Sequence, residues 1–234
     1  MAIHAIWGPP HSGKTTLAID LASALIAHGQ SVCLISPEPY SELSARLNIN
    51  IPEDKSLGAA FSATTSLKHI TYKVTDLFYV LAAPSYGGVF IEEVPSEDIK
   101  KMFGMIRGIY DYILVDCPPR MDSLIAAWAL NLASTVLFLS GSQVASVLWH
   151  HTFKSAAESI QSKVVPICVM TSKQFNYQEL SKAIEMVPQV TVPYYRDAEA
   201  EQNTHQTLYR SGVKGYSTSI DELIRYLKAE GRSV

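Results

Sequence analysis

Residues 3–16 read I-H-A-I-W-G-P-P-H-S-G-K-T-T, and this stretch decides how the chain folds. It contains the pattern G-x-x-x-x-G-K-[ST] between Gly8 and Thr15. An apolar run of strand length, residues 3–7, comes directly before the pattern, and a helical leucine pattern over residues 17–25 follows it. Strand, glycine-rich loop and helix in this order are the setting in which the pattern binds the phosphates of a nucleotide.

Each part of this loop has its own task in phosphate binding. Gly8 and Gly13 let backbone N–H groups approach phosphate oxygens, because no side chain intervenes. The helix that begins near Gly13 adds its positive dipole end, Lys14 can reach the β- and γ-phosphates, and the Thr15 hydroxyl can ligate Mg²⁺. His11 is a further candidate for phosphate contact. The predicted nucleotide-binding residues of the loop are Gly8, His11, Ser12, Gly13, Lys14, Thr15 and Thr16.

The carboxylate that completes the metal site is predicted at Asp116. This residue ends the apolar run at residues 112–116, and the Pro-Pro pair at residues 118–119 forces the chain out of the strand. The carboxylate is therefore expected at the carboxyl edge of the sheet, where it and Thr15 are the predicted metal residues. An unpaired carboxylate after so apolar a strand would be costly. Asp111, one strand length earlier, is expected at the opposite edge in a structural role.

Apolar runs of strand length recur along the chain at residues 3–7, 32–35, 77–82, 112–117, 135–139 and 164–170. Most are continuous rather than alternating, which indicates strands that are buried on both faces. Further helices are predicted at residues 96–107, 123–132, 142–162, 177–186 and 219–229. The pattern predicts an α/β fold, with a mostly parallel sheet flanked by helices on both faces in the three layers of a Rossmann-like P-loop NTPase.

The last predicted helix and residues 49–75 each lead to a prediction about where they lie in the fold. The last predicted helix opens with a capping-box pattern at residues 219–222, and its apolar face is expected to dock on the sheet, with membrane binding as the alternative. Residues 49–75 carry proline, glycine and many serines and threonines, so they are expected to form a surface excursion.

The composition describes a globular protein. The chain has 234 residues, of which 47% are hydrophobic and 18% charged, and we expect one domain over residues 1–234. Cys33, Cys117 and Cys168 stand among apolar neighbours and are expected to be buried core residues. The longest uncharged stretch, residues 124–139, is shorter than the roughly 20 residues of a membrane-spanning helix. With no signal-peptide pattern either, we expect a cytoplasmic protein that reaches membrane or nucleoid through partners.

The charge balance limits contact with nucleic acid. Nineteen lysines and arginines stand against 22 aspartates and glutamates, which gives a net charge of −3 and no whole-chain basic field. Basic residues gather toward the C-terminus, where acidic residues interleave with them. A solvated mixed face and a non-specific DNA patch are both open there. The basic residues are Arg210, Lys214, Arg225, Lys228 and Arg232.

Three segments together resemble the ParA/MinD family of P-loop ATPases. They are the phosphate loop, D-Y-I-L-V-D-C-P-P at residues 111–119, and V-P-Y at residues 192–194 before an Arg-Asp turn. Residues 77–119 are especially similar to the ParA and TadZ/CpaE branches. The resemblance implies that ATP and Mg²⁺ close a sandwich dimer, that hydrolysis reopens it, and that this switch positions plasmids, division proteins or surface machinery.

The family's functional residues carry over to several positions here. Lys14 and Thr15 match the P-loop lysine and threonine, and Asp116 matches the metal-organising aspartate. The resemblance also implies base contacts at Ser172 and in the loop that holds Pro193 and Tyr194. Tyrosines either stack on an adenine ring or pack the C-terminal region together. They are Tyr194, Tyr195, Tyr209 and Tyr216.

The chain departs from the family pattern at two places. Pro9 stands where the family carries a lysine that reaches the partner's phosphates, and Ser36-Pro37-Glu38 replaces an Asp-x-Asp pair. Glu38 keeps one acidic group that can position the attacking water, so Lys14, Glu38 and Asp116 are the predicted catalytic residues. Slow hydrolysis is expected, because a missing cation can cost several powers of ten in rate. Arg120 either supplies that charge or is simply solvated.

Three functions follow from these residues. The leading one is a dimeric ATPase switch with an unknown protein partner that stimulates hydrolysis or is the cargo. The second is a nucleotide-binding scaffold without turnover, which Pro9 and Ser36 motivate. The third is a P-loop phosphotransferase. For the switch, plasmid or chromosome partition and a pilus or secretion apparatus are both open as the positioned assembly.

Overall fold

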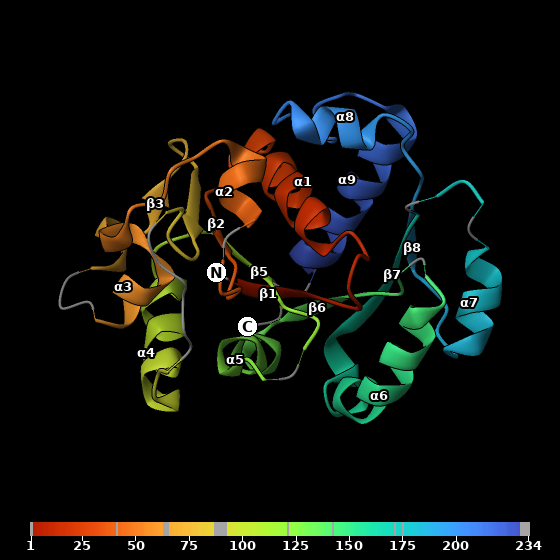
Figure 1. Cartoon of the computed structure of the whole chain (residues 1–234), viewed down its shortest axis with the longest axis horizontal. Coiled ribbons are helices and arrows are strands. Elements are labelled where there is room, and N and C mark those ends of the chain that lie inside the picture. The colour runs from red at the N-terminus through yellow and green to blue at the C-terminus, as the bar shows by residue number, and fades with distance from the viewer. Residues whose placement is uncertain are drawn as a thin grey trace.

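One mostly parallel sheet forms the centre of the molecule (Figure 1). The computed structural model describes residues 2–40, 42–62, 66–86, 93–120, 122–141, 143–170, 172–174 and 176–229. Within these ranges, eight strands lie in the order β3-β4-β2-β5-β1-β6-β7-β8, and only β3 is antiparallel to its neighbour. The strands are β1 (Ala2–Trp7), β2 (Val32–Ile35), β3 (Tyr72–Lys73), β4 (Phe78–Leu81), β5 (Tyr112–Asp116), β6 (Thr135–Leu139), β7 (Val164–Val169) and β8 (Val190–Val192).

Helices cover both faces of this sheet. Figure 1 shows α1, α8 and α9 on one side, and α4, α5 and α6 on the other. The described helices are α1 (Lys14–Ala27), α2 (Glu42–Leu47), α3 (Leu57–Phe61), α4 (Ser96–Arg107), α5 (Leu124–Leu132), α6 (Ala145–Ser159), α7 (Tyr177–Ala183), α8 (Ala198–Asn203) and α9 (Lys214–Ala229). The predicted three-layer α/β fold is confirmed.

The core is divided by the sheet into two apolar clusters. Side chains alternate between the faces of a strand, so Ile6 of β1 belongs to the cluster under α1 and α9, and Ile3 to the cluster under α4 and α5. All three cysteines are buried and free, as the sequence predicted. No helix in the described part of the chain is both long and apolar enough to cross a membrane.

The pairings of β1 with its two neighbouring strands bring the predicted site residues together. β5 and β6 both pair with β1 in parallel, and Ile6 lies opposite Asp116 of β5. The carboxyl end of β5 therefore lies beside the point where the chain leaves β1 and enters the phosphate loop. This register is what brings residue 116 next to residues 8–16.

The sequence prediction of the last helix was wrong about its start. α9 begins at Lys214 rather than at Ser219, whose hydroxyl donates to the carbonyls of Gly215 and Thr191 at 3.0 and 3.2 Å. Gly215 lowers the helical signal of the first turn, and the capping-box pattern lies inside the helix. The apolar face does dock as predicted, because Ile220 and Leu223 are fully buried against the sheet and α1.

The reading of residues 49–75 as a surface excursion was also wrong. Ile51, Leu57 and Leu67 are buried, and the short helix α3 packs against α4. These elements are too short to show a period in the sequence, although Leu57 and Leu67 belong to the second cluster and Ile51 to the first. Strands β3 and β8, of two and three residues, escaped prediction for the same reason. Of the positions discussed above, residues 63–65, 87–92, 142 and 230–234 lie outside the described residues.

Candidate functional site

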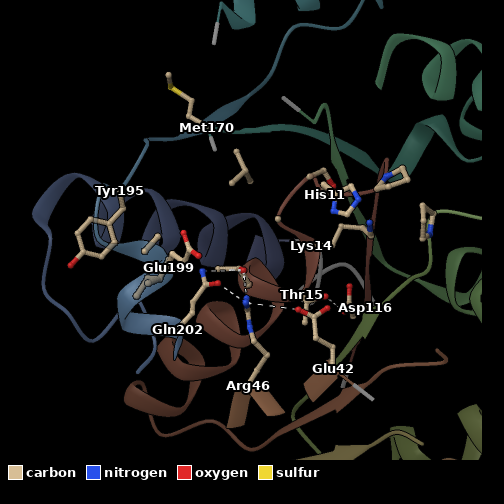
Figure 2. Close-up of a pocket in the computed structure, with 18 of the residues that line it drawn as sticks. His11, Lys14, Thr15, Glu42, Arg46, Asp116, Met170, Tyr195, Glu199 and Gln202 are labelled. Carbon is tan, nitrogen blue, oxygen red and sulfur yellow. Dashed lines mark hydrogen bonds and ion pairs between the residues drawn. The ribbon is translucent and has the colours of Figure 1, made fainter. Parts of the chain in front are cut away.

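A cleft of about 580 Å³ opens at the carboxyl edge of the sheet (Figure 2). The phosphate loop and the first turn of α1 form its floor, Glu38 and α2 line one side, and the segment from Pro193 to α8 lines the other. This edge is where open α/β sheets bind their ligands, because loops from several strands converge there. The predicted residues that line the cleft are His11, Ser12, Gly13, Lys14, Thr15, Thr16, Glu38, Asp116, Pro193 and Tyr194.

The two loop glycines occupy positions that a side chain could not. Gly13 has φ of 86°, and a Cβ there would lie 3.2 Å from Cγ1 of Val169. At Gly8 a Cβ would lie 2.8 Å from the carbonyl oxygen of Leu139, closer than real Cβ atoms approach. Gly8 does not line the cleft itself and instead lets the loop pack on β6. The loop backbone is thus free to face a ligand on its open side.

Lys14 is buried at the bottom of the cleft. Its Nζ donates to the carbonyl oxygen of Pro9 at 2.9 Å, which bends the side chain back over the loop. Burial lowers the pKa of Lys14, and the carboxylates of Asp116 and Glu38 oppose that shift. A buried ammonium whose close partner is a neutral carbonyl favours an anion in the cleft.

Thr15 and Asp116 meet beside Lys14. The Thr15 hydroxyl donates to Oδ2 of Asp116 at 2.7 Å, and burial raises the pKa of Asp116 to about 6. Oδ1 of Asp116 and Oγ of Ser12 are buried without a hydrogen-bond partner among the described residues. An orphaned carboxylate oxygen beside a threonine hydroxyl fits Mg²⁺, and the orphaned hydroxyl and glycine cradle fit phosphate. The residues present therefore suit a magnesium nucleotide.

Glu38 lies at the mouth of the cleft, in an ion-pair chain. Nη2 of Arg120 is 3.6 Å from its carboxylate, and Nε of Arg120 is 3.4 Å from Asp122. Arg120 is half exposed and does not line the cleft. Ser36, at the other end of the Ser-Pro-Glu segment, is buried.

Ser172 is the predicted residue that the structure places elsewhere. It does not line the cleft, and its hydroxyl accepts from the backbone N–H of Gln174 at 3.2 Å. The hydroxyl therefore caps a local turn. Asp111 takes the structural role predicted for it, because its carboxylate accepts from the backbone N–H and the hydroxyl of Ser31 at 2.8 and 2.6 Å.

The tyrosines act mainly in packing. The Tyr216 hydroxyl donates to the buried carboxylate of Asp20 at 2.6 Å, and the Tyr209 backbone N–H donates to the same group at 3.0 Å. Burial raises the pKa of Asp20 to about 6. These bonds join α1 to the C-terminal region, as expected if Tyr209 and Tyr216 pack that region together rather than stack on an adenine ring. Tyr194 and Tyr195 line the cleft and stay candidates for contact with a base.

Sequence reasoning missed the polar residues that α2 and α8 bring to the cleft. Arg46 and Glu42 of α2 and Gln202 of α8 all line it. One signal was available, since Glu42 and Arg46 are four residues apart, the spacing of an ion pair on a helix. Gln202 gave none, because a glutamine in a polar segment has no distinctive pattern.

Of the described histidines, His11 alone lines the cleft. The described residues contain no group of three or more His, Cys, Asp or Glu side chains that could hold a metal ion. A magnesium ion at Thr15 and Asp116 would need phosphate and water oxygens to complete its shell. His150 is buried with a ring nitrogen 3.0 Å from the carbonyl oxygen of Ser140.

Comparisons with known proteins identify the family of the chain. A family model described as an AAA domain matches residues 11–165. The chromosome-partitioning ATPase Soj of Treponema pallidum (strain Nichols) is 30% identical over 118 residues, which cover 48% of this chain and 46% of that protein. The match thus spans about half the length of this curated relative.

Two solved structures share the whole fold. MinD in the MinC:MinD cell division complex of Aquifex aeolicus superposes with a TM-score of 0.78 and 18% identity, covering 100% of this chain and 97% of that chain. The septum site-determining protein MinD with Mg-ADP from Pyrococcus horikoshii OT3 gives a TM-score of 0.74 and 16% identity, covering 99% and 100%. The matching AAA domain model, the relatives and the fold together show that the chain belongs to the ParA/MinD family of P-loop ATPases.

Proposed function

We propose that this protein is a switch that closes into a dimer on ATP and Mg²⁺, hydrolyses ATP slowly and thereby positions a larger assembly. The observation that carries the proposal is the 2.7 Å hydrogen bond between Thr15 and Asp116 at the head of α1. It brings the hydroxyl of the phosphate loop and the carboxylate of a neighbouring strand together beside Lys14. A P-loop protein needs this combination to hold a magnesium nucleotide.

The residues of the cleft divide the work of binding. Lys14 would exchange the carbonyl of Pro9 for phosphate oxygens, because the anion is the stronger acceptor. Thr15 and Asp116 would hold Mg²⁺, with the orphaned Oδ1 of Asp116 turned to the metal shell. The bound metal would supply cancellation of charge during phosphoryl transfer.

Glu38 is the residue proposed to position the attacking water. It lines the cleft, and the ion pair with Arg120 at 3.6 Å restrains its side chain. Turnover should be slow, because Pro9 brings no cation to the phosphates and a missing cation can cost several powers of ten in rate. Arg120 is the nearest candidate to restore part of that charge.

Exposed apolar side chains beside the loop support a protein interface there. Val144 is 89% exposed and Leu148 is 72% exposed, one helical turn apart at the start of α6. They follow Gly141, which packs against Pro9 of the phosphate loop. Exposed apolar groups that gather at one place favour association, and we assign this face to the ATP-dependent dimer.

The test is the molecular mass in solution, measured by light scattering with Mg-ATP, with Mg-ADP and without nucleotide. The wild type should double its mass only with Mg-ATP, and Lys14→Ala should stay monomeric. Lys68→Ala, an exposed lysine away from the cleft, is the matched control and should behave as the wild type. A monomer under all three conditions would exclude the switch.

A nucleotide-binding scaffold without turnover is the second candidate. It is favoured by Ser36, which is buried where the family has an acidic residue, and by Pro9 in place of the lysine. Phosphate release decides between the candidates. Release above background that disappears in Glu38→Gln supports the switch, and background release with a cognate partner present supports the scaffold.

The positioned assembly is proposed to be either a plasmid or chromosome, as the name of the Treponema pallidum relative suggests, or a pilus or secretion apparatus. We expect the protein to act from the cytoplasm. Acidic Asp221 and Glu222 lie on the same helix, α9, as basic Arg225 and Lys228, and the net charge is −3. Co-sedimentation with non-specific DNA separates the two roles: Mg-ATP-dependent binding supports partition, and its absence at low salt favours the apparatus.

A further inference from the structure

Arg46 brings a second positive charge into the cleft. It lies in the last turn of α2, and its side chain is only 20% exposed. Among the described residues that line the cleft, Lys14 and Arg46 are the only lysine and arginine. Figure 2 shows the Arg46 side chain extending from α2 between Glu42 and Gln202, toward the first turn of α1.

The hydrogen-bond acceptors of Arg46 carry no charge, and the buried carboxylate of Asp20 acts on Arg46 only through space. Its Nη2 donates to Oγ1 of Thr16, and its Nη1 donates to Oε1 of Gln202. Both acceptors are neutral. The carboxylate of Glu42 is 3.8 Å from Nη1, and that side chain is 59% exposed, so water screens the pair. A guanidinium cannot lose its proton in a protein, so Arg46 keeps a full charge in the cleft.

Contact with Thr16 places this charge at one end of the phosphate site. Thr16 is the third residue of α1, and the N–H groups of a first helical turn have no partner within the helix. In this motif the loop and helix N–H groups hold the α- and β-phosphates, and the lysine reaches the β- and γ-phosphates. Arg46 approaches the helix end from α2, whereas Lys14 bends back over the loop.

The other contact of Arg46 lies on the nucleoside side of the cleft. Gln202 belongs to α8, which with Tyr195 lines the wall opposite α2. Arg46 therefore stands between the helix that holds phosphate and the wall that would hold the nucleoside. The group that joins phosphates to nucleoside is the α-phosphate.

We propose that Arg46 binds the α-phosphate of the nucleotide, giving up the neutral oxygens of Thr16 and Gln202 for a phosphate oxygen. The inference rests on the proposed nucleotide-binding function and adds a contact outside the P-loop motif. The exchange is favourable, because an anionic phosphate oxygen attracts the guanidinium charge more strongly than a neutral oxygen does, and the arginine fork matches phosphate. Thr16 and Gln202 hold the side chain in place beforehand, which reduces the entropy lost on binding.

The test is titration calorimetry with ADP and with ATP on four proteins: the wild type, Arg46→Gln, Arg46→Lys and the matched control Arg210→Gln, at an exposed arginine outside the lining of the cleft. Arg46→Gln should weaken both nucleotides equally, by about 10- to 100-fold, because both carry the α-phosphate. Arg46→Lys should lose less, since it keeps the charge. Arg210→Gln makes the same change of side chain away from the cleft and should bind both nucleotides as the wild type does.

Phosphorus NMR of bound ADP supplies a readout that a structural role would not move. The α-phosphorus resonance should shift more than the β-phosphorus resonance in Arg46→Gln. Wild-type affinity in Arg46→Gln, or an equal loss in Arg210→Gln, would overturn the inference. If Arg46→Gln does not fold, Arg46→Lys is compared with Arg210→Gln by the same criteria. A wild type that binds neither nucleotide would overturn the proposed function itself.

Discussion

Thr15 and Asp116 lie 101 positions apart in the chain and share a hydrogen bond of 2.7 Å. The parallel register of β1 and β5, which sets Ile6 opposite Asp116, produces this contact. Oδ1 of Asp116 is left buried and without a partner in the described part of the chain. The pairing of β1 with β5 therefore helps to bring together the two residues that we propose hold Mg²⁺.

Removing the Thr15 hydroxyl should destabilise the free protein. Thr15→Val keeps the shape of the side chain but removes the donor to Oδ2 of the buried Asp116 carboxylate. This loss should lower the free energy of unfolding by about 1–3 kcal/mol. Thr15→Ser keeps the hydroxyl and is the control. Urea unfolding without nucleotide measures the difference, and equal stability of Thr15→Val and Thr15→Ser would argue against the role of this bond.

Glu38→Gln should abolish phosphate release while leaving Mg-ATP binding within about threefold of wild type, because a positioning base acts on water and not on the phosphates. Asp122→Asn is the matched control, since Asp122 also pairs with Arg120 but lies outside the lining of the cleft. A phosphate-release assay measures both variants. If Glu38→Gln retains the wild-type rate, Glu38 is not the water-positioning residue.

His4 lies buried in the central strand β1, where we expect it to lower the stability of the folded protein. It is fully buried, neither ring nitrogen has a hydrogen-bond partner among the described residues, and burial lowers its pKa from 6.5 to about 4. Replacing it by leucine should stabilise the protein at pH 7 by about 1–3 kcal/mol, because unsatisfied polar atoms disappear.

The pH profile gives the same variant a second test. Below pH 6.5 the unfolded chain takes up a proton at His4 that the folded protein refuses until about pH 4, so wild-type stability falls between these values. The stability gained by His4→Leu should therefore grow as the pH is lowered through this window. His151→Leu, at an exposed histidine, should show no such growth. Parallel profiles for His4→Leu and wild type would contradict the assignment.

The main architecture was predictable because long buried strands leave continuous apolar runs. The runs at residues 32–35 and 135–139 coincide with β2 and β6, and α4 occupies its predicted residues 96–107. Short elements were not predicted, because strands of two or three residues, such as β3 and β8, cannot show a period in the sequence. The start of α9 was predicted wrongly, because Gly215 weakens the helical signal of the first turn and a capping-box pattern lies inside the helix.

The site was predictable to the extent that contacts are local or follow from strand ends. Gly13, Lys14 and Thr15 lie together in one motif, and Asp116 was placed by the end of its strand. Arg46 and Gln202 were not found, because their meeting depends on how two short helices pack around the cleft. Ser172 was carried over from the resemblance, and its loop holds it at a turn instead.

The most direct test of the account is calorimetric titration of Mg-ATP into the wild type and Lys14→Ala, each repeated with the metal chelated. We predict saturable binding at one site per chain in the wild type, at least about tenfold weaker binding in Lys14→Ala, and weaker wild-type binding without Mg²⁺. Absence of wild-type binding, or equal affinity in Lys14→Ala, would contradict the claim that this cleft holds a magnesium nucleotide.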